Sequence, residues 1–219
     1  MTSIYLPSRG AGDWQLLLAD PVKHWRTGYS ARTLAHCWEA AAGLPPEIKR
    51  LFGERAELLI AIPEHKVPLP RGRESQSDLF ALISVGRETV AATIEGKVNE
   101  SFDKLVSEWL VDASDGKLER PDYLCTMLGL NSATVGHLRY QLLHRTASAI
   151  IEARRFKTDR AAMVVHSFSP TRLWFGDFAQ FVAAIGGKAE PDVPCAVQLS
   201  DGMRLMLGWA SGDERFLQV

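Results

Sequence analysis

The sequence predicts a mixed α/β fold in which helices cover both faces of a sheet. Two neighbouring apolar runs, residues 78–85 and 88–98, are rich in Val, Ile, Thr, Leu and Ala. Gly86 and Arg87 separate them, and a loop of two residues with Gly first is typical of a type II′ hairpin turn. Both faces of these runs are largely apolar, as in a sheet that is buried on both sides. Helical periodicity before and after the hairpin supplies the covering helices.

The first predicted element is a helix over residues 31–42, for which Ser30 is a good N-cap and Gly43 a stop. The remaining predicted elements, in chain order, are a helix over 46–52, a strand over 56–62, the hairpin, helices near 102–109, 123–128 and 134–156, a strand over 161–168, a helix over 175–185, and a hairpin of 193–199 with 204–209. The order is therefore helix, three strands, helices and strand, followed by a C-terminal appendix.

Length and charge limit the classes of protein to consider. The 219 residues have 46% hydrophobic content, which is enough for one core, so a single domain over residues 1–219 is expected. The 25 basic and 26 acidic residues give a net charge of −1. This balance excludes an overall basic field, so any polyanion has to be held locally.

Cysteine and histidine usage indicates neither a disulfide framework nor a zinc motif. Cys37, Cys125 and Cys195 lie far apart, and the histidines show no zinc-ligand spacing, so His166 is expected to be a structural hydrogen-bonding residue. The odd number of separate cysteines leads us to expect a reducing, cytoplasmic location. The sequence also shows no signal-like stretch and no apolar run of the roughly 20 residues that a membrane span needs.

Asp78 and Glu95 are predicted to face each other across the hairpin. If Val85 and Glu88 flank the turn, paired residue numbers sum to 173, as 78 and 95 do. Opposed residues share a face with Cβ atoms about 4.5–5.5 Å apart, and Lys97 points to that same face. Two carboxylates so close share a proton or bind a cation. Because Mg²⁺ binds one or two carboxylates plus water and phosphate oxygens, Asp78, Glu95 and the Gly96 carbonyl form a candidate shell beside Lys97.

Asp78, followed after sixteen residues by Glu95-Gly96-Lys97, resembles the PD-(D/E)XK nuclease superfamily, which has the restriction-endonuclease-like fold. The resemblance covers residues 30–168 and implies a core of helix, three-strand meander, helix and strand, with extra helices and a C-terminal β-hairpin appendix over 169–219. It implies Mg²⁺ or Mn²⁺ at Asp78 and Glu95, Lys97 assisting the water, and DNA as the partner. Ser77 replaces the Pro of the family motif. The chain is similar to a bacterial branch of the superfamily, which supplies no substrate.

Further site residues follow from the same resemblance. Glu39 of the first helix is a candidate metal ligand, Gln141 of the long helix a candidate catalytic residue, and Arg145 a weaker candidate on the same face of that helix. Positive charge also gathers before Asp78, and these residues are candidates for contact with a phosphate backbone: Lys66, Arg71 and Arg73.

Other interpretations stay open at this point. Glu95 and Lys97 also suit solvated strand ends, and Glu39 suits an ordinary surface position. The main alternative is a catalytically inactive module that keeps the fold as a binding or assembly surface, with a homodimer left open. A third is an unrelated α/β enzyme, which a largest pocket remote from Asp78 would favour.

Overall fold

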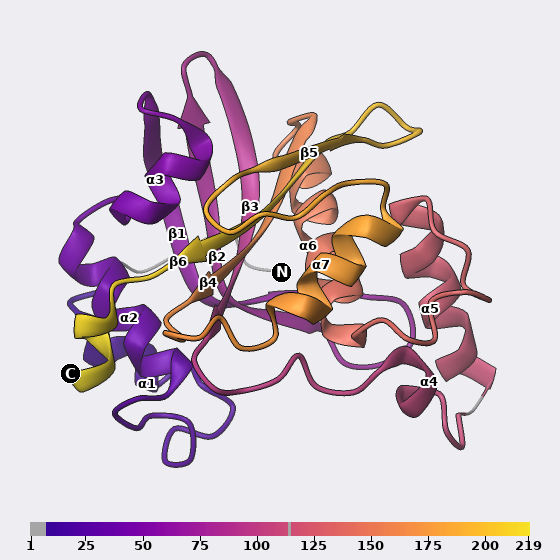
Figure 1. Ribbon diagram of the computed structural model, residues 1–219, viewed down its shortest axis with the longest axis horizontal. Coiled ribbons are helices and arrows are strands. Elements are labelled where there is room, and N and C mark those ends of the chain that lie inside the picture. The colour runs from indigo at the N-terminus through magenta and orange to yellow at the C-terminus, as the bar shows by residue number, and fades with distance from the viewer. Residues whose placement is uncertain (1–7, 114) are drawn as a thin grey trace.

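The computed structural model describes residues 8–113 and 115–219, and its elements form three layers (Figure 1). The middle layer is a mixed six-stranded sheet with the order β1-β2-β3-β4-β6-β5. In chain order the elements are α1 (Ala11–Gln15), α2 (Ser30–Ala41), α3 (Pro46–Phe52), β1 (Ala56–Val67), β2 (Ser75–Val85), β3 (Glu88–Lys97), α4 (Val106–Trp109), α5 (Asp115–Leu128), α6 (Tyr140–Arg155), β4 (Arg160–Ser167), α7 (Phe175–Ala184), β5 (Cys195–Gln198), β6 (Arg204–Ser211) and the 3₁₀ helix η1 (Glu214–Gln218).

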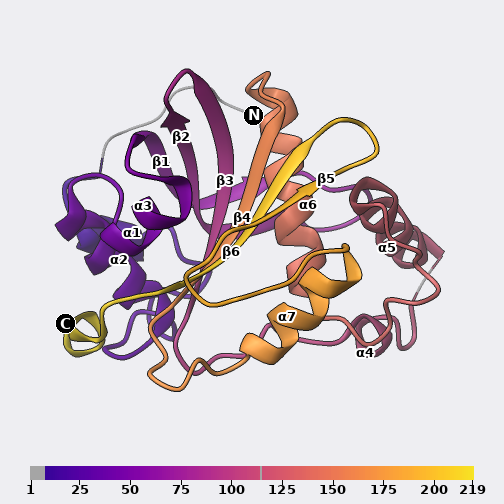
Figure 2. The same cartoon turned by 45° about the horizontal axis from the view of Figure 1, so that its top comes forward.

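Helices cover both faces of the sheet, as the apolar character of both strand faces predicted. On one face, sheet residues such as Phe80 pack in a buried cluster with Leu143 of α6 and Phe181 of α7. On the other face, Leu79 belongs to a second cluster with Leu34 of α2 and other residues of α1, α3 and η1. Figure 2 shows α1, α2 and α3 on one side of the strands and α5, α6 and α7 on the other. The α/β prediction is confirmed.

The central hairpin has the predicted turn and register. β2 and β3 pair from Leu79↔Ile94 to Val85↔Glu88, and each of these pairs sums to the predicted 173. Gly86 has a φ of 68°, whereas Arg87 is not among the residues with positive φ. A positive φ at the first turn position alone is the signature of a type II′ turn, for which glycine is the favoured residue.

The first helix is where the sequence predicted it, but its N-terminus is stabilised differently. Ser30 is the first helical residue and Tyr29 occupies the N-cap position, so the predicted capping role of Ser30 is wrong. Instead, the backbone N–H of Ser30 donates to the carboxylate of Glu100, which follows β3, at 3.0 Å. A helix N-terminus attracts negative charge. Glu100, which lies 70 positions after Ser30 in the sequence, supplies that charge.

Two helices are shorter than predicted. The helix predicted over 134–156 begins at Tyr140, because Arg139 is extended and bridges to Leu105. The helix predicted over 102–109 is limited to Val106–Trp109. Tertiary pairing has therefore replaced helical structure at both positions, and the same pairing joins α6 to the segment that follows β3.

The C-terminal hairpin extends the main sheet and is not an appendix. β6 pairs parallel with β4, with Val165 opposite Trp209, and β5 pairs antiparallel with β6. Trp209 is fully buried in the cluster that contains Phe178. Without β6, the apolar strand β4 would expose an edge that invites pairing with another chain. The segment predicted to be an extension therefore completes the core.

A substitution at Gly208 of β6 tests how closely β6 packs against α3. A Cβ atom at Gly208 would lie 2.8 Å from Leu51 Cδ1 of α3, which is closer than carbon atoms approach without a shift. We expect Gly208→Ala to lower the free energy of unfolding by about 1–3 kcal/mol, measured by urea denaturation. Gly176→Ala is the control, because its added methyl group meets no atom within 4 Å. An unchanged stability of Gly208→Ala would contradict close packing of β6 against α3.

Candidate active site

The candidate site lies where β2 and β3 separate. Their pairing ends at Leu79↔Ile94, whereas β2 stays paired with β1 as far as Ser75 and β3 stays paired with β4 as far as Lys97. Asp78 and Glu95, predicted to face each other, lie one step beyond the last pair in the same register, where the two strands no longer pair. The Asp78 carboxylate occupies the gap instead, and its Oδ2 accepts a hydrogen bond from the Gly96 N–H at 2.8 Å.

The backbone of Gly96 faces the same gap. The N–H and C=O of one strand residue point to the same side of the strand, and the N–H of Gly96 points to Asp78 of β2. Consistent with this, the carbonyl of the next residue, Lys97, points away and accepts from Phe168 N at 2.8 Å. The Gly96 carbonyl, predicted as a metal ligand, is therefore directed to the space beside Asp78.

Three donors surround the Glu95 carboxylate. Its Oε1 accepts from Lys97 Nζ at 2.9 Å and from Gln141 Nε2 at 2.7 Å, and its Oε2 accepts from Arg145 Nε at 2.6 Å. Gln141 and Arg145 lie four residues apart on α6 and reach Glu95 from one helix face, as their spacing predicted. The structure thus brings four of the predicted site residues together, with Glu95 at 3% exposure and Lys97 at 4%.

Arg145 is held in place by its own neighbours. Its Nη1 donates to Ser75 Oγ at 3.2 Å, and that hydroxyl lies 2.9 Å from His144 Nδ1. Burial, together with the charge of Arg145, lowers the pKa of His144 well below its ordinary value, so this histidine is neutral near pH 7. The cations that face Glu95 are therefore Lys97 and Arg145.

A third carboxylate, which sequence reasoning missed, completes the group. Glu64 of β1 lies between the pairs Pro63↔Leu79 and His65↔Ser77, and so across from Asp78. Its φ of 52° is unusual for a residue other than glycine, and such backbone strain is often found at functional sites. Glu64 Oε2 accepts from Gln76 Nε2 at 2.6 Å. The signal was available in principle, because continuing the predicted strand past Ile62 brings Glu64 to the level of Asp78.

Burial and mutual repulsion set the protonation of the three carboxyl groups. Burial, with the neighbouring Asp78, raises the pKa of Glu64 to about 8. Burial and the charge of Glu95 raise the pKa of Asp78 to about 7. Burial acts in the same direction on Glu95, but Arg145 and Lys97 outweigh it and hold the pKa of Glu95 below its ordinary value. Glu95 is therefore ionised near pH 7, whereas Glu64 is mainly protonated and Asp78 is partly protonated, and a cation would displace these protons.

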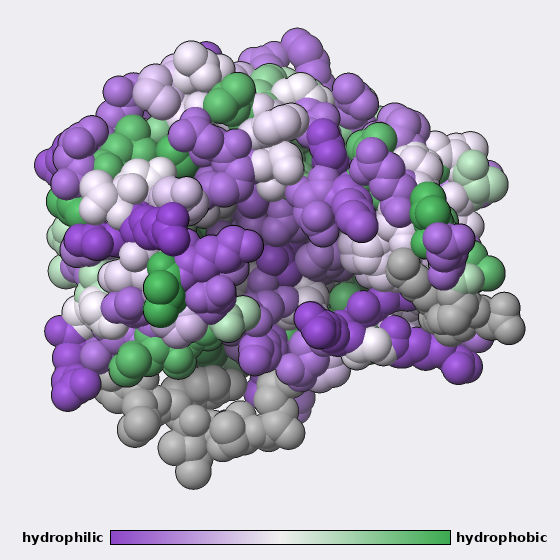
Figure 3. All heavy atoms as spheres, turned by 90° about the horizontal axis from the view of Figure 1, so that it is seen from below, coloured by the Kyte–Doolittle hydropathy of each residue, from purple (hydrophilic) through white to green (hydrophobic). Residues whose placement is uncertain are grey.

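The group opens into a pocket of about 440 Å³. Glu64, Asp78 and Arg145 line this pocket together with Lys23, His24 and other residues of the segment before α2. Figure 3 shows the molecule from the side toward which β3 runs in Figure 1, with a central hollow lined mainly by hydrophilic residues. Carboxylates and cations thus face one solvent-connected space.

Comparison with protein families gives a match over nearly the whole chain. A sequence model described as a domain of unknown function, DUF6946, matches residues 7–214. The chain belongs to the DUF6946 family. Comparisons with curated proteins and with solved structures give no match. The family description assigns no activity, so the chemistry of this DUF6946 chain has to be argued from its residues.

Glu39 is not brought to the Asp78 group of the DUF6946 chain. Its Oε1 accepts from Trp14 Nε1 at 2.7 Å and from Ser8 Oγ at 2.6 Å. It lines a different pocket, of about 670 Å³, which is larger than the one at Asp78. The third carboxylate beside Asp78 and Glu95 is therefore that of Glu64 on β1, and not that of Glu39 on α2.

The basic residues predicted before Asp78 lie outside its pocket. Lys66 and Arg73 are exposed, and Arg71 forms an ion pair with the exposed Glu119 at 2.5 Å. The basic residues that line the pocket are Lys23, His24 and Arg145. Within the described part of the chain we find no helix with the length and apolar character that crossing a membrane requires.

Proposed function

We propose that this chain is a metal-dependent phosphodiesterase with a restriction-endonuclease-like core, which cuts DNA by attack of water on phosphorus. The observation that carries the proposal is the convergence of Asp78, Glu95 and Lys97 at the point where β2 and β3 separate. The order of α2, the β1-β2-β3 meander, α6 and β4 also agrees with the core that the resemblance implies.

The oxygen atoms of this group suit a hard divalent cation. No described residue donates a hydrogen bond to Asp78 Oδ1, and Glu95 Oε2 accepts from Arg145 alone among the described residues. Both atoms therefore keep lone pairs for a metal, and the Gly96 carbonyl faces the same gap. Mg²⁺ and Mn²⁺ prefer such carboxylate and carbonyl oxygens. When bound, the cation would polarise a phosphoryl oxygen and acidify a water molecule.

Two neighbouring side chains can act on the attacking water. Lys97 carries a positive charge beside Glu95, where it offsets the negative charge that develops on the phosphate oxygens. Gln141 donates to Glu95 through Nε2, while its Oε1 is buried and no described residue donates to it. This oxygen is therefore available to accept a hydrogen bond from water held next to Glu95.

Charge around the pocket is compatible with a phosphate-bearing substrate. Lys23 and His24 line the pocket together with the carboxylates of Glu64, Asp78 and Glu100, and they can donate to phosphate oxygens of a bound substrate. The carboxylates of the site cancel part of the positive charge, so a net charge of −1 is compatible with a nuclease. It disfavours charge-driven coating of DNA without sequence preference.

One observation favours the second candidate, an inactive module with this fold. Lys97 and Arg145 already neutralise Glu95, so a cation has to compete with two fixed charges. A cleavage panel separates the candidates. The purified chain is incubated with Mg²⁺ or Mn²⁺ and with duplex DNA, single-stranded DNA or RNA. Metal-dependent cleavage of DNA supports the proposal, and no cleavage in any arm supports the inactive module.

The third interpretation, an unrelated enzyme with its site elsewhere, has one observation in its favour. The pocket beside Glu39, of about 670 Å³, is larger than the pocket at Asp78 and shares no lining residue with it. Its lining is mainly apolar, with residues such as Leu17 and Trp38, and the carboxylate of Glu39 is already bonded to Trp14. Convergent titratable groups with shifted pKa values lie at Asp78 instead, and we place the activity there.

Metal binding is expected to strengthen as pH rises. Protonated Asp78 and Glu64, with pKa values of about 7 and 8, have to lose their protons before they bind a cation. From about pH 6 to about pH 8 the ionised fraction of Asp78 alone rises about tenfold, so the affinity for Mn²⁺ should rise at least about tenfold. Calorimetric titration in buffers of different ionisation enthalpy measures both affinity and proton release. A constant affinity without proton release would contradict binding at these carboxylates.

A further inference from the structure

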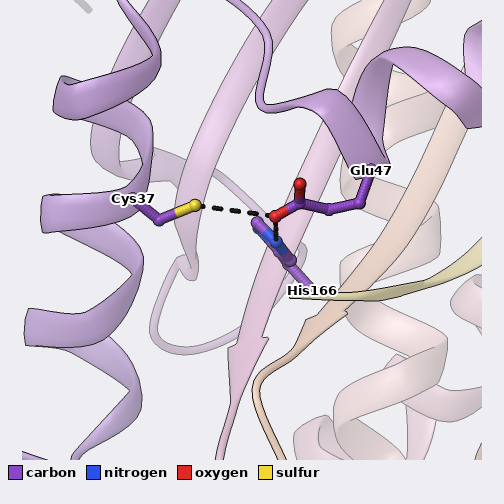
Figure 4. Close-up of side chains that lie close together, drawn as sticks. All are labelled: Cys37, Glu47 and His166. Atoms are coloured by element: carbon purple, nitrogen blue, oxygen red, sulfur yellow. Dashed lines mark hydrogen bonds and ion pairs between the residues drawn. The ribbon is translucent and has the colours of Figure 1, made fainter. Parts of the chain in front are cut away.

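Cys37, Glu47 and His166 form a second cluster of metal-ligating side chains, from α2, α3 and β4 respectively (Figure 4). Cys37 Sγ lies 3.6 Å from Glu47 Oε1, and His166 Nε2 lies 2.8 Å from the same oxygen. One ligand atom from each residue lies within 4.8 Å of the others. All three residues are buried, with His166 completely inaccessible. Three donors from three separate elements thus converge inside the protein.

We propose that Cys37, Glu47 and His166 bind one Zn²⁺ ion, at a site separate from the Asp78 group. A thiolate sulfur, an imidazole nitrogen and a carboxylate oxygen are the donors that zinc takes, at about 2.0–2.3 Å, in tetrahedral sites. The sulfur makes this set softer than the oxygen donors around Asp78, so it selects Zn²⁺ over Mg²⁺. The Cys37 Sγ to Glu47 Oε1 distance of 3.6 Å already suits two ligands of one zinc ion, and His166 Nε2 has to move about half an ångström away from Glu47 Oε1 for the ion to enter.

The fourth position of the ion opens onto solvent. Cys37 and Glu47 line a pocket of about 460 Å³, which shares no lining residue with the pocket at Asp78. Arg50 and Arg215 line the same pocket. Zinc sites with three protein ligands keep an open position for water or another small ligand. Arg215 is paired with Asp213 of the same lining at 3.2 Å, so Arg50 is the guanidinium group that remains for a small anion there.

Zinc binding has a defined proton balance. Burial and the nearby Glu47 raise the pKa of the Cys37 thiol, so its proton has to leave to solvent when sulfur binds the metal. Trp38 Nε1 donates to His166 Nδ1 at 3.3 Å, which places the single proton of the neutral ring on Nε2, where it is donated to Glu47. Nε2 can bind zinc only when this proton moves to Nδ1. Trp38 must then release its contact, so its indole reports on the binding event.

The test is titration of the full chain, first treated with a chelator, with Co²⁺ and then with Zn²⁺. Thiolate bound to Co²⁺ gives a charge-transfer absorption that carboxylate ligands do not, so this band distinguishes the cluster from the Asp78 group. We expect one equivalent of Co²⁺ to produce the band and Zn²⁺ to remove it. Cys37→Ser should abolish the band, while Cys125→Ser, which alters another buried thiol, should keep it.

A wild-type chain that gives no band, or a folded Cys37→Ser variant that keeps it, would overturn the zinc site. If Cys37→Ser does not fold, His166→Gln replaces it and has to weaken zinc binding by at least about tenfold. Trp38→Phe gives an independent readout, because it removes the N–H that occupies Nδ1. We expect this variant to bind zinc several-fold more tightly, and weaker binding would contradict the assigned proton movement.

Discussion

Asp78→Asn is expected to lower metal-dependent DNA cleavage by at least about a hundredfold. Changing the outer neighbours of metal ligands already lowers affinity or activity about 10–100-fold, and here a ligand itself is removed. The amide keeps an oxygen that can accept from Gly96 N–H, so the separation of β2 and β3 should persist. Initial rates of cleavage of a labelled DNA at several Mn²⁺ concentrations measure the loss.

Thermal unfolding is the control for this variant. Ionising Asp78 at its buried position is unfavourable, since its pKa is raised to about 7, so stability is lost as pH rises from its ordinary pKa to that value. The neutral amide avoids this loss, and the melting temperature of Asp78→Asn at about pH 8 should equal or exceed that of the wild type. Glu57→Gln, an exposed change on β1, should leave cleavage intact. Full activity in folded Asp78→Asn would rule out Asp78 as a ligand.

Glu95→Ala is expected to destabilise the fold by about 3–5 kcal/mol, because it leaves Lys97 and Arg145 buried without their shared counter-charge. For a chain of this size that corresponds to a fall in melting temperature of roughly 6–20 °C. Loss of activity in this variant therefore does not by itself identify a metal ligand, and Asp78→Asn is the sharper test.

Differential scanning calorimetry of Glu95→Ala beside Glu95→Gln separates charge from hydrogen bonding. The amide of Gln retains one acceptor oxygen, so Glu95→Gln should be less destabilised than Glu95→Ala. Adding Arg145→Met to Glu95→Ala removes one of the unpaired cations and should recover part of the stability. Equal melting temperatures for wild type and Glu95→Ala would show that these pairs contribute nothing to the fold.

The sequence predicted the central hairpin well because its signals are local. Gly86-Arg87 determines the turn, the turn determines the register, and the register from Leu79 to Val85 follows. Local signals failed where tertiary pairing decides the outcome. β6 was read as part of an appendix, although both of its faces are apolar, because no local pattern says which strand it will pair with.

The same limit explains what was missed at the candidate site. Glu95 and Lys97 are two residues apart on one strand and Gln141 and Arg145 four apart on one helix, so periodicity alone placed each pair on one face. Glu64 could be found only by extending β1 beyond Pro63 and pairing it with β2. Glu39 shares its helix with residues that face the sheet, but its carboxylate turns to Trp14.

The Cys37 cluster could not be found from spacing at all. Its three residues are 10 and 119 positions apart in sequence, because α2, α3 and β4 each contribute one. His166 was expected to be a structural hydrogen-bonding residue, and its bonds to Trp38 and Glu47 agree with that role in the metal-free protein. Zinc spacing rules describe ligands carried on one short loop or helix, and they do not apply to a site assembled by packing.

The central claim is that the carboxylates at the separation of β2 and β3 bind a divalent cation. Diffraction from crystals soaked in Mn²⁺, with an anomalous difference map, tests it directly. The account predicts a peak about 2.1–2.2 Å from Asp78 Oδ1 and Glu95 Oε2, with Lys97 still bonded to Glu95 Oε1. A crystal grown at about pH 8 that shows bound Mn²⁺ elsewhere, and none at Asp78, would contradict the account.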